Sequence, residues 1–224
     1  MKILAIDTAT EGCSVALLHD AEVMERFEVT PRGHADRVLD MVREVLAEAE
    51  MTLAQLDVIA FDRGPGSFTG VRIGCSVAQG FGFAVDRPLI GVSSLQALAH
   101  AALRAQSAVN HVCAMIDARM QEIYAGCYER SEGVPQLLGQ EAVLPASELI
   151  LPEDQASWLA SGTGWDAYRT DFSEGLAARI VHADGTALPH AADIAQLAVS
   201  AFHTGEAIAA ELAHPTYLRD RVTS

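Results

Sequence analysis

The chain has 224 residues, of which 50% are hydrophobic and 20% charged, and its 15 Lys and Arg against 30 Asp and Glu give a formal net charge of −15. A chain that is half apolar can bury a sizeable core, which excludes a disordered protein. The acidic balance argues against unaided nucleic-acid binding, because affinity for phosphate rests on Lys and Arg contacts. Any role with nucleic acid would need a basic partner.

The cysteines and the N-terminus indicate a cytoplasmic protein. Cys13, Cys75, Cys113 and Cys127 lie far apart, with neither a C-x-x-C pair for zinc nor the density of a disulfide scaffold. Asp7 comes too early for a signal-peptide core, and no apolar run reaches the ~18 residues that a membrane span needs. We expect reduced thiols, location in the cytoplasm and no membrane contact.

The first half of the chain predicts three strands followed by alternating helices and strands, an arrangement typical of a mixed α/β sheet. Apolar runs bounded by turns indicate the strands, and apolar residues spaced i, i+3, i+4 and i+7 indicate the first helix. In chain order the predicted elements are strands 2–7, 13–18 and 22–29, helix 34–50, strand 56–61, helix 70–85, strand 89–92 and helix 94–104.

The second half begins with the same pattern. Strand 111–117 ends in an aspartate, as strand 2–7 does, and an offset of 110 positions superposes Asp7 on Asp117. The repeat suggests two domains of similar topology, 1–107 and 108–224. The later elements expected are strands 123–128, 158–163 and 180–183 and helix 191–202.

A glycine-rich segment, RGPGSFTG at 63–70, lies between a predicted strand and a predicted helix. Amide groups in such a turn can hold an anion at a helix N-terminus, so Gly64, Gly66 and Ser67 are candidate phosphate contacts. The alternative is a tight turn with an N-cap. The segment matches neither phosphate fingerprint, because Val71 stands where a P-loop needs Lys and Thr69 where the dinucleotide motif needs Gly.

The strand-end aspartates Asp7 and Asp117 are further candidates for positioning a phosphate. The alternative role of each is a hydrogen bond to turn amides. Arg119, two positions beyond Asp117, would fill the space that a phosphate needs, so we expect the second site to be impaired. Neither H-E-x-x-H nor G-x-S-x-G occurs, and we predict no metal site and no catalytic residue.

Small residues recur every fourth position along helix 70–85, at Gly70, Gly74, Ala78 and Gly82. Glycine inside a helix costs ~0.5–1 kcal/mol relative to alanine, so this stripe needs a compensating close contact. The contact is either with the chain's own sheet or with a partner helix. The broad apolar face of helix 34–50 makes a partner more plausible.

Five motifs occur together and in order: ILAIDTAT at 3–10, RGPGSFTGVRIG at 63–74, GVSSLQALA at 91–99, DARMQEIY at 117–124 and PTYLRD at 215–220. With them the chain resembles the TsaB (YeaZ-like) family of bacterial tRNA N6-threonylcarbamoyladenosine (t6A) biosynthesis proteins over essentially its whole length. The resemblance implies an α/β fold of two ribonuclease-H-like (actin-like ATPase) domains, with mixed sheets flanked by helices.

The resemblance also implies a function and its partners. The family is a non-catalytic scaffold for its paralogue TsaD, which transfers threonylcarbamoyl to adenosine 37 of tRNA, and the ATPase TsaE joins the same assembly. A second copy of the chain replaces TsaD when TsaD is absent, and tRNA is reached through the complex. No cofactor is implied, except a nucleotide at the interface with the partner.

Specific residues follow from the resemblance. The paralogue binds its metal through two histidines four apart, and the corresponding positions here are Ser94 and Leu98, which cannot act as imidazole ligands. The first domain's two helices would form the partner face, and our hypothesis for its residues is Val38, Val42, Val45, Val71, Gly74, Ala78 and Gly82. The phosphate candidates Asp7, Gly64, Gly66, Ser67 and Asp117 would be vestigial.

Other functions remain open at this level. An ATPase or phosphotransferase of the same fold is motivated by Asp7 and the glycine-rich segment. A protease acting on the partner has no visible nucleophile constellation. Direct tRNA contact would fall on Arg26, Arg32, Arg37 and Arg43, but the interspersed acids predict a solvated surface there.

Overall fold

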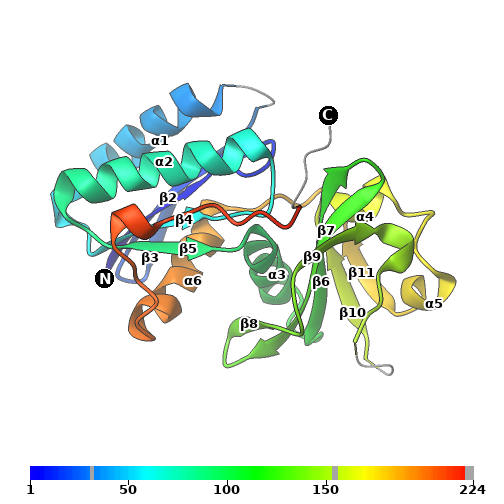
Figure 1. Cartoon of the computed structure of the whole chain (residues 1–224). Coiled ribbons are helices and arrows are strands. Elements are labelled where there is room, and N and C mark those ends of the chain that lie inside the picture. The colour runs from blue at the N-terminus through cyan, green and yellow to red at the C-terminus, as the bar shows by residue number, and fades with distance from the viewer. Residues whose placement is uncertain (31–32, 153–155, 220–224) are drawn as a thin grey trace. The chain divides into compact units, whose positions relative to one another are not determined.

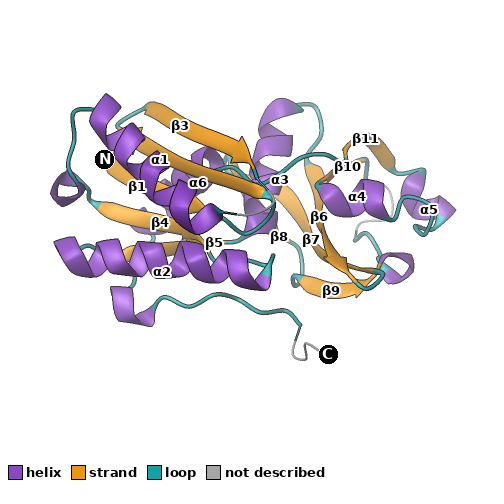
Figure 2. Ribbon diagram, turned by 90° about the horizontal axis from the view of Figure 1, so that it is seen from above, coloured by secondary structure: helices purple, strands orange, loops and turns teal. Residues whose placement is uncertain are grey.

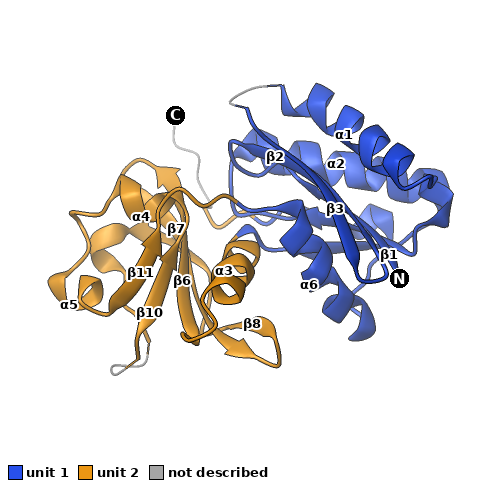
Figure 3. Ribbon diagram, turned by 180° about the vertical axis from the view of Figure 1, so that it is seen from behind, with its two compact units in different colours: residues 1–94, 189–216 blue, residues 95–188, 217–224 orange. Residues whose placement is uncertain are grey.

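The computed structural model describes residues 1–30, 33–152 and 156–219. The chain divides into two compact units, the first made of 1–94 and 189–216 and the second of 95–188 and 217–224 (Figure 3). The predicted single boundary at residue 107 is therefore wrong. The chain returns to the first unit near its end, because the apolar helix at 191–203 packs on that unit's sheet.

The sheet of the first unit has the order β3-β2-β1-β4-β5. Strands β1, β2 and β3 pair antiparallel, whereas β4 and β5 run parallel to β1, with Ala5 opposite Ala60. The strands are β1 (Lys2–Asp7), β2 (Gly12–His19), β3 (Glu22–Val29), β4 (Val58–Asp62) and β5 (Leu89–Val92). Buried on both faces, β1 and β4 read as continuous apolar runs.

Helices cover both faces of this sheet (Figures 1 and 2). α1 (His34–Glu48) and α2 (Phe68–Val85) pack with Leu4 and Ile6 in one core, and α6 (Ala191–His203) contacts β1, β2, β4 and β5 on the other side. The 3₁₀ turns η1 (Leu53–Gln55) and η3 (Ala210–Leu212) complete the unit. The helical period of α1 places its buried residues on this core: Val38, Met41, Val42, Val45 and Leu46.

The sheet of the second unit repeats the first, with the order β11-β10-β6-β7-β8 and with β9 also paired to β7. Its strands are β6 (His111–Arg119), β7 (Glu122–Ser131), β8 (Val134–Leu137), β9 (Ala142–Pro145), β10 (Trp158–Ser161) and β11 (Ile180–Asp184). Its helices are α3 (Ser94–Ala105), α4 (Thr163–Ala167) and α5 (Glu174–Ala177), with the 3₁₀ turn η2 (Ala146–Glu148).

Both units thus carry three antiparallel strands followed by two parallel ones, which is the ribonuclease-H-like arrangement that was predicted. The difference is that β8 and β9 divide the third strand of the second unit between them. The sequence did not reveal these two strands, because each has four residues and carries a proline, Pro135 or Pro145. Proline is tolerated there because these are edge strands.

Candidate functional site

Asp7, at the end of β1, is completely buried. Its Oδ1 accepts a hydrogen bond from the amide of Ala9 at 2.8 Å, as the turn-amide alternative predicted. Burial raises the pKa of the Asp7 carboxyl well above its usual range, and the neighbouring carboxyl of Asp62 raises it further. A carboxyl that is completely buried and accepts from a turn amide is not placed to contact a phosphate.

The glycine-rich segment is closed onto the turn after β1. The amide of Ser67 donates to the carbonyl of Ala9 at 2.7 Å, and the hydroxyl of Thr8 donates to the carbonyl of Gly70 at 2.7 Å. A side chain at Gly66 or Gly70 would meet these carbonyls, because an added Cβ would lie 2.3 Å from Ala9 O and 2.0 Å from Thr8 O, respectively. The glycines therefore allow backbone to approach backbone.

The phosphate cradle predicted at Gly64, Gly66 and Ser67 is not what the structure shows. The amide of Gly64 donates to Asp62 Oδ1 at 2.7 Å, and the amide of Ser67 is engaged as described. Ser67 instead caps α2, its Oγ accepting from the amide of Gly70. The N-cap alternative is confirmed.

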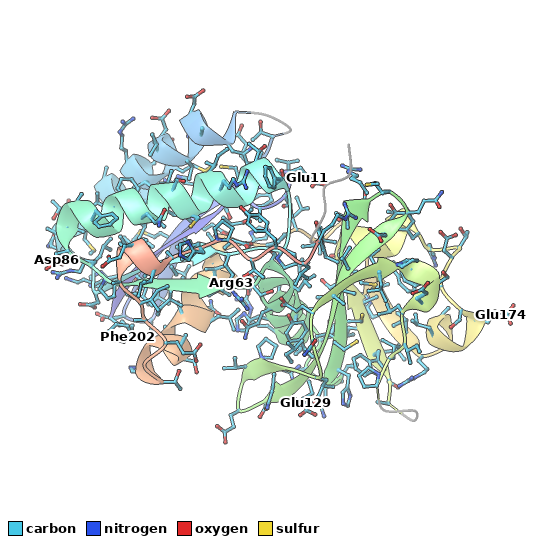
Figure 4. All side chains as sticks on the ribbon, in the orientation of Figure 1. Glu11, Arg63, Asp86, Glu129, Glu174 and Phe202 are labelled. Carbon is cyan, nitrogen blue, oxygen red and sulfur yellow. The ribbon has the colours of Figure 1, made fainter. Side chains whose placement is uncertain are left out.

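Figure 4 labels Arg63, whose guanidinium donates to the Thr216 hydroxyl at 3.0 Å.

The second strand-end aspartate has a different environment. Asp117 Oδ2 accepts from the guanidinium of Arg119 at 2.7 Å, and Oδ1 accepts from the Arg119 amide and from the hydroxyl of Tyr168 at 2.9 Å. Arg119 therefore forms an ion pair with the Asp117 carboxylate. That its side chain fills the space of a phosphate stays a prediction. The φ angles of Arg119, Met120 and Gln121 are all positive, so three consecutive non-glycine residues adopt the left-handed conformation there.

Ser94 and Leu98, the positions compared with the paralogue's histidines, are both buried in the interior of this chain. Ser94 is fully buried, and its hydroxyl donates to Asp62 Oδ1 at 2.6 Å. Leu98 is fully buried in an apolar cluster with Leu95, Ala114 and Tyr128. Across the ranges that the structure describes, no group of three or more His, Cys, Asp or Glu side chains could hold a metal ion.

The seven residues proposed for the partner face lie in the interior, so that hypothesis is wrong in its residues. All seven are classed as buried: Val38, Val42, Val45, Val71, Gly74, Ala78 and Gly82. The stripe on α2 faces the chain's own sheet, since an added Cβ at Gly74 would lie 2.8 Å from Thr8 Oγ1 and at Gly82 3.1 Å from a Leu89 methyl. Close packing within the unit explains the glycines.

The opposite side of α2 carries the exposed apolar residues that the sequence reading missed. Phe83 is 64% exposed and Phe68 50% exposed, with the guanidinium of Arg72 3.4 Å from the Phe68 ring centre. Between them lie the exposed small residues Ser76 and Gly80. A signal was present in the sequence, because these positions lie on the helical face opposite the glycine stripe.

The arginines near α1 are neutralised by neighbouring acids. Arg26, Arg37 and Arg43 each form an ion pair with an acid on α1, and Arg37 also pairs with Glu28 on β3. The expected solvated surface is confirmed for these three arginines. Arg32 lies outside the described residues. Within those residues, no helix is long and apolar enough to cross a membrane.

The two ribonuclease-H-like units define a protein of the actin-like α/β class. Its family is shown by comparison with known proteins: the statistical model of the family described as "TsaD: tRNA N6-adenosine threonylcarbamoyltransferase" matches residues 27–224. TsaB of Escherichia coli (strain K12), a tRNA threonylcarbamoyladenosine biosynthesis protein, is 43% identical, with 99% of this chain and 96% of that protein covered. TsaB of Haemophilus influenzae is 40% identical, with 100% and 95% covered.

The solved structure of YeaZ from Pseudomonas aeruginosa matches with a TM-score of 0.91 and 48% identity, covering 97% of this chain and 99% of that one. A second structure from that organism, described as an uncharacterized protein with similarity to peptidase YeaZ, matches with a TM-score of 0.92 and 48% identity over the same shares. The chain belongs to the TsaB (YeaZ-like) family of tRNA threonylcarbamoyladenosine biosynthesis proteins.

Proposed function

We propose that this chain is a non-catalytic scaffold subunit in t6A synthesis, which binds TsaD and thereby supports threonylcarbamoyl transfer to adenosine 37 of tRNA. Membership of the TsaB family supports the pathway. The observation that carries the binding role is the exposed face of α2, where Phe68 and Phe83 flank the small residues Ser76 and Gly80.

This face has the composition of a helix-docking surface. Two aromatic rings on the solvent side of one helix form an apolar surface that a stable monomer gains nothing by exposing. Small residues between them let another backbone come close, as they do elsewhere in α2 against the sheet. Leu39, 37% exposed on α1, adds a further apolar side chain on the outer side of the helix pair.

The strand ends support a scaffold over the ATPase or phosphotransferase alternative. Asp7 is buried, with the pKa of its carboxyl raised by burial and by Asp62, and the amides of Gly64 and Ser67 donate within the chain. At the second strand end Arg119 takes the carboxylate that a metal-bound phosphate would use. Sustained ATP hydrolysis by the purified chain alone would overturn this argument and restore the enzymatic alternative.

The wider assignment completes the proposal. TsaE joins the assembly, a second copy of the chain takes the α2 face when TsaD is absent, and tRNA is reached through the complex. The chain acts in the cytoplasm without a cofactor of its own, and any nucleotide lies at the interface with the partner. A net charge of −15 fits a subunit that does not hold tRNA by itself.

The docking face is tested by Phe83→Glu, which puts a charge on the exposed side of α2. We expect binding to TsaD, measured by calorimetry, to weaken by about tenfold or more, because buried interface aromatics dominate affinity. The matched control is Val181→Glu, on β11 and 56% exposed, which should bind as the unmodified chain does. Equal weakening by both variants, or by neither, would overturn the assignment. Ala78→Glu is unsuitable, because Ala78 lies in the core.

The role in the pathway is tested by reconstitution. TsaD, TsaE and a source of threonylcarbamoyl-adenylate are incubated with tRNA, and t6A is quantified by mass spectrometry with the chain present or omitted. Product that depends on the chain, and that falls with Phe83→Glu but not with Val181→Glu, supports the scaffold. Equal product without the chain would contradict it.

A further inference from the structure

The ends of β1 and β4 bring two carboxyl groups together inside the first unit. The parallel register pairs Ile6 with Phe61, so Asp7 and Asp62 are the next residues along the two strands. Because side chains alternate along a strand, and Ile6 and Phe61 face the core with α1 and α2, both aspartates point to the opposite face. Asp7 is 0% exposed and Asp62 1% exposed.

The hydrogen bonds around the pair engage Oδ1 of each carboxyl. Asp62 Oδ1 accepts from the amide of Gly64 and from the hydroxyl of Ser94, and Asp7 Oδ1 accepts from the amide of Ala9. Asp7 Oδ2 is buried and has no donor among the described residues, while the Asp62 carboxyl lies within hydrogen-bonding reach of Asp7. Two adjacent buried carboxylates cannot both be ionised at an acceptable free energy.

The strongest electrostatic influences on Asp7 come from other acids. Among the described residues, these are Asp62 and, more weakly, Glu25 on β3. Glu25 is itself held by His190 and by the amide of Ala192 at the start of α6. Other ionisable groups on the packed elements include Cys13 on β2 and Asp193 in α6, and the Arg63 guanidinium, in the turn after β4, donates to Thr216.

We propose that Asp7 and Asp62 share one proton in the folded chain, and that this proton holds the turn from Asp62 to Gly70 against the end of β1. The shared proton makes a hydrogen bond between the two strand ends. Asp62 in turn fixes Gly64 and Ser94, and Ser67 is tied to Ala9. Loss of the proton would set two buried negative charges against each other and loosen this turn.

The sign of the pH dependence follows from linkage. A carboxyl that keeps its proton in the folded chain but loses it near pH 4 when unfolded makes the folded state bind more protons. The contribution of this carboxyl to the free energy of unfolding is fully present below about pH 4. It is lost as the pH rises toward the higher pKa of the folded pair. Within that window the folding equilibrium constant falls by up to about tenfold per pH unit for one proton.

The test compares the unmodified chain with Asp62→Asn. Asparagine keeps the oxygen that accepts from Gly64 and Ser94 and places an amide donor toward Asp7, so it replaces the shared proton permanently. Denaturant unfolding is measured from about pH 5 to 8.5, with Asp171→Asn, at an exposed aspartate, as the matched control. We expect the stability of Asp62→Asn relative to the unmodified chain to rise with pH, and that of the control to stay parallel to it. A constant difference at every pH would overturn the proposal.

Two further measurements keep the proposal testable if Asp62→Asn folds poorly. In the unmodified chain with ¹³C-labelled aspartate carboxyls, NMR should show a protonated carboxyl persisting at neutral pH, and full ionisation of every aspartate there would refute it. Hydrogen exchange, corrected for intrinsic rates, should show the amides of Gly64 and Ser67 losing protection as the pH rises.

A bridging cation is the competing explanation and is distinguished by adding Mg²⁺ or EDTA at pH 8. If the two carboxyls share a proton, the unfolding midpoint should be the same with Mg²⁺ as with EDTA. A Mg²⁺-dependent rise that Asp62→Asn lacks would mean that a metal, not a proton, joins the pair, and would overturn the proposal.

Discussion

Each of the two units contains a strand that ends in an aspartate before a turn, but the two aspartates differ in burial and in their partners. In the first unit Asp7 is wholly buried beside a second acid. In the second unit Asp117 lies near the surface, with its side chain 16% exposed, and is paired with Arg119 and Tyr168. The environment of a strand-end acid therefore depends on neighbours that the tertiary structure supplies, because both its burial and its charged partners come from other segments of the chain.

The largest effect is expected from breaking the first turn with Gly70→Ala. The added Cβ would lie 2.0 Å from Thr8 O, and backbone must move to relieve the contact. We expect a loss of about 3 kcal/mol in the free energy of unfolding, measured by urea denaturation at pH 7. Gly80→Ala is the control, because nothing lies within 4 Å of that position, and it should stabilise the chain by ~0.5–1 kcal/mol. Equal midpoints for the two variants would contradict the closed turn.

Asparagine at each strand end should act in opposite directions at pH 8. Asp7→Asn removes the acid whose pKa is raised by burial and by Asp62, so the free energy of unfolding should increase. Asp117→Asn weakens the hydrogen bonds from Arg119 and Tyr168, so it should decrease, by about 1 kcal/mol. Denaturant unfolding of both variants checks the signs, and a shared sign would show that the two sites do not differ as described.

The smallest effect should come from Tyr168→Phe and appear in alkaline solution. Partial burial, and then the hydrogen bond to Asp117, raise the pKa of the Tyr168 hydroxyl above its usual value near 10. Its contribution is therefore present below about pH 10 and lost as the pH rises through the higher folded pKa. Tyr168→Phe should remove that decline in unfolding midpoint between about pH 9 and 11, whereas Tyr217→Phe should not. An unchanged decline would argue against the contact with Asp117.

The sequence predicted most elements because their signals are local. The strands at 22–29 and 89–92 have the predicted ends, and the helix predicted at 34–50 ends two residues earlier. The division between units could not be predicted from local composition. Helix 191–203 returns to the first unit because its apolar face fits that sheet, which is a property of two segments far apart in the chain.

The candidate residues show the same limit. The spacing at 70–85 correctly indicated close packing, but it could not say whether the neighbour was the chain's own sheet or a partner. The structure shows Thr8 and Leu89 there, and leaves Phe68 and Phe83 outside. A stripe of small residues allows another segment to pack closely, because its side chains are absent or small. It carries no information about which segment packs there.

Residue order alone predicted most strands, the main helices, the repeat of Asp7 at Asp117 and, through five motifs, the family. Those properties depend on residue order and helical or strand period. Only the tertiary structure decided that the glycine-rich segment closes on Ala9, that Asp7 meets Asp62, and which side of α2 faces solvent. Each depends on distances between residues far apart in the chain, and a buried charge or a backbone contact has a free energy only once those distances are set.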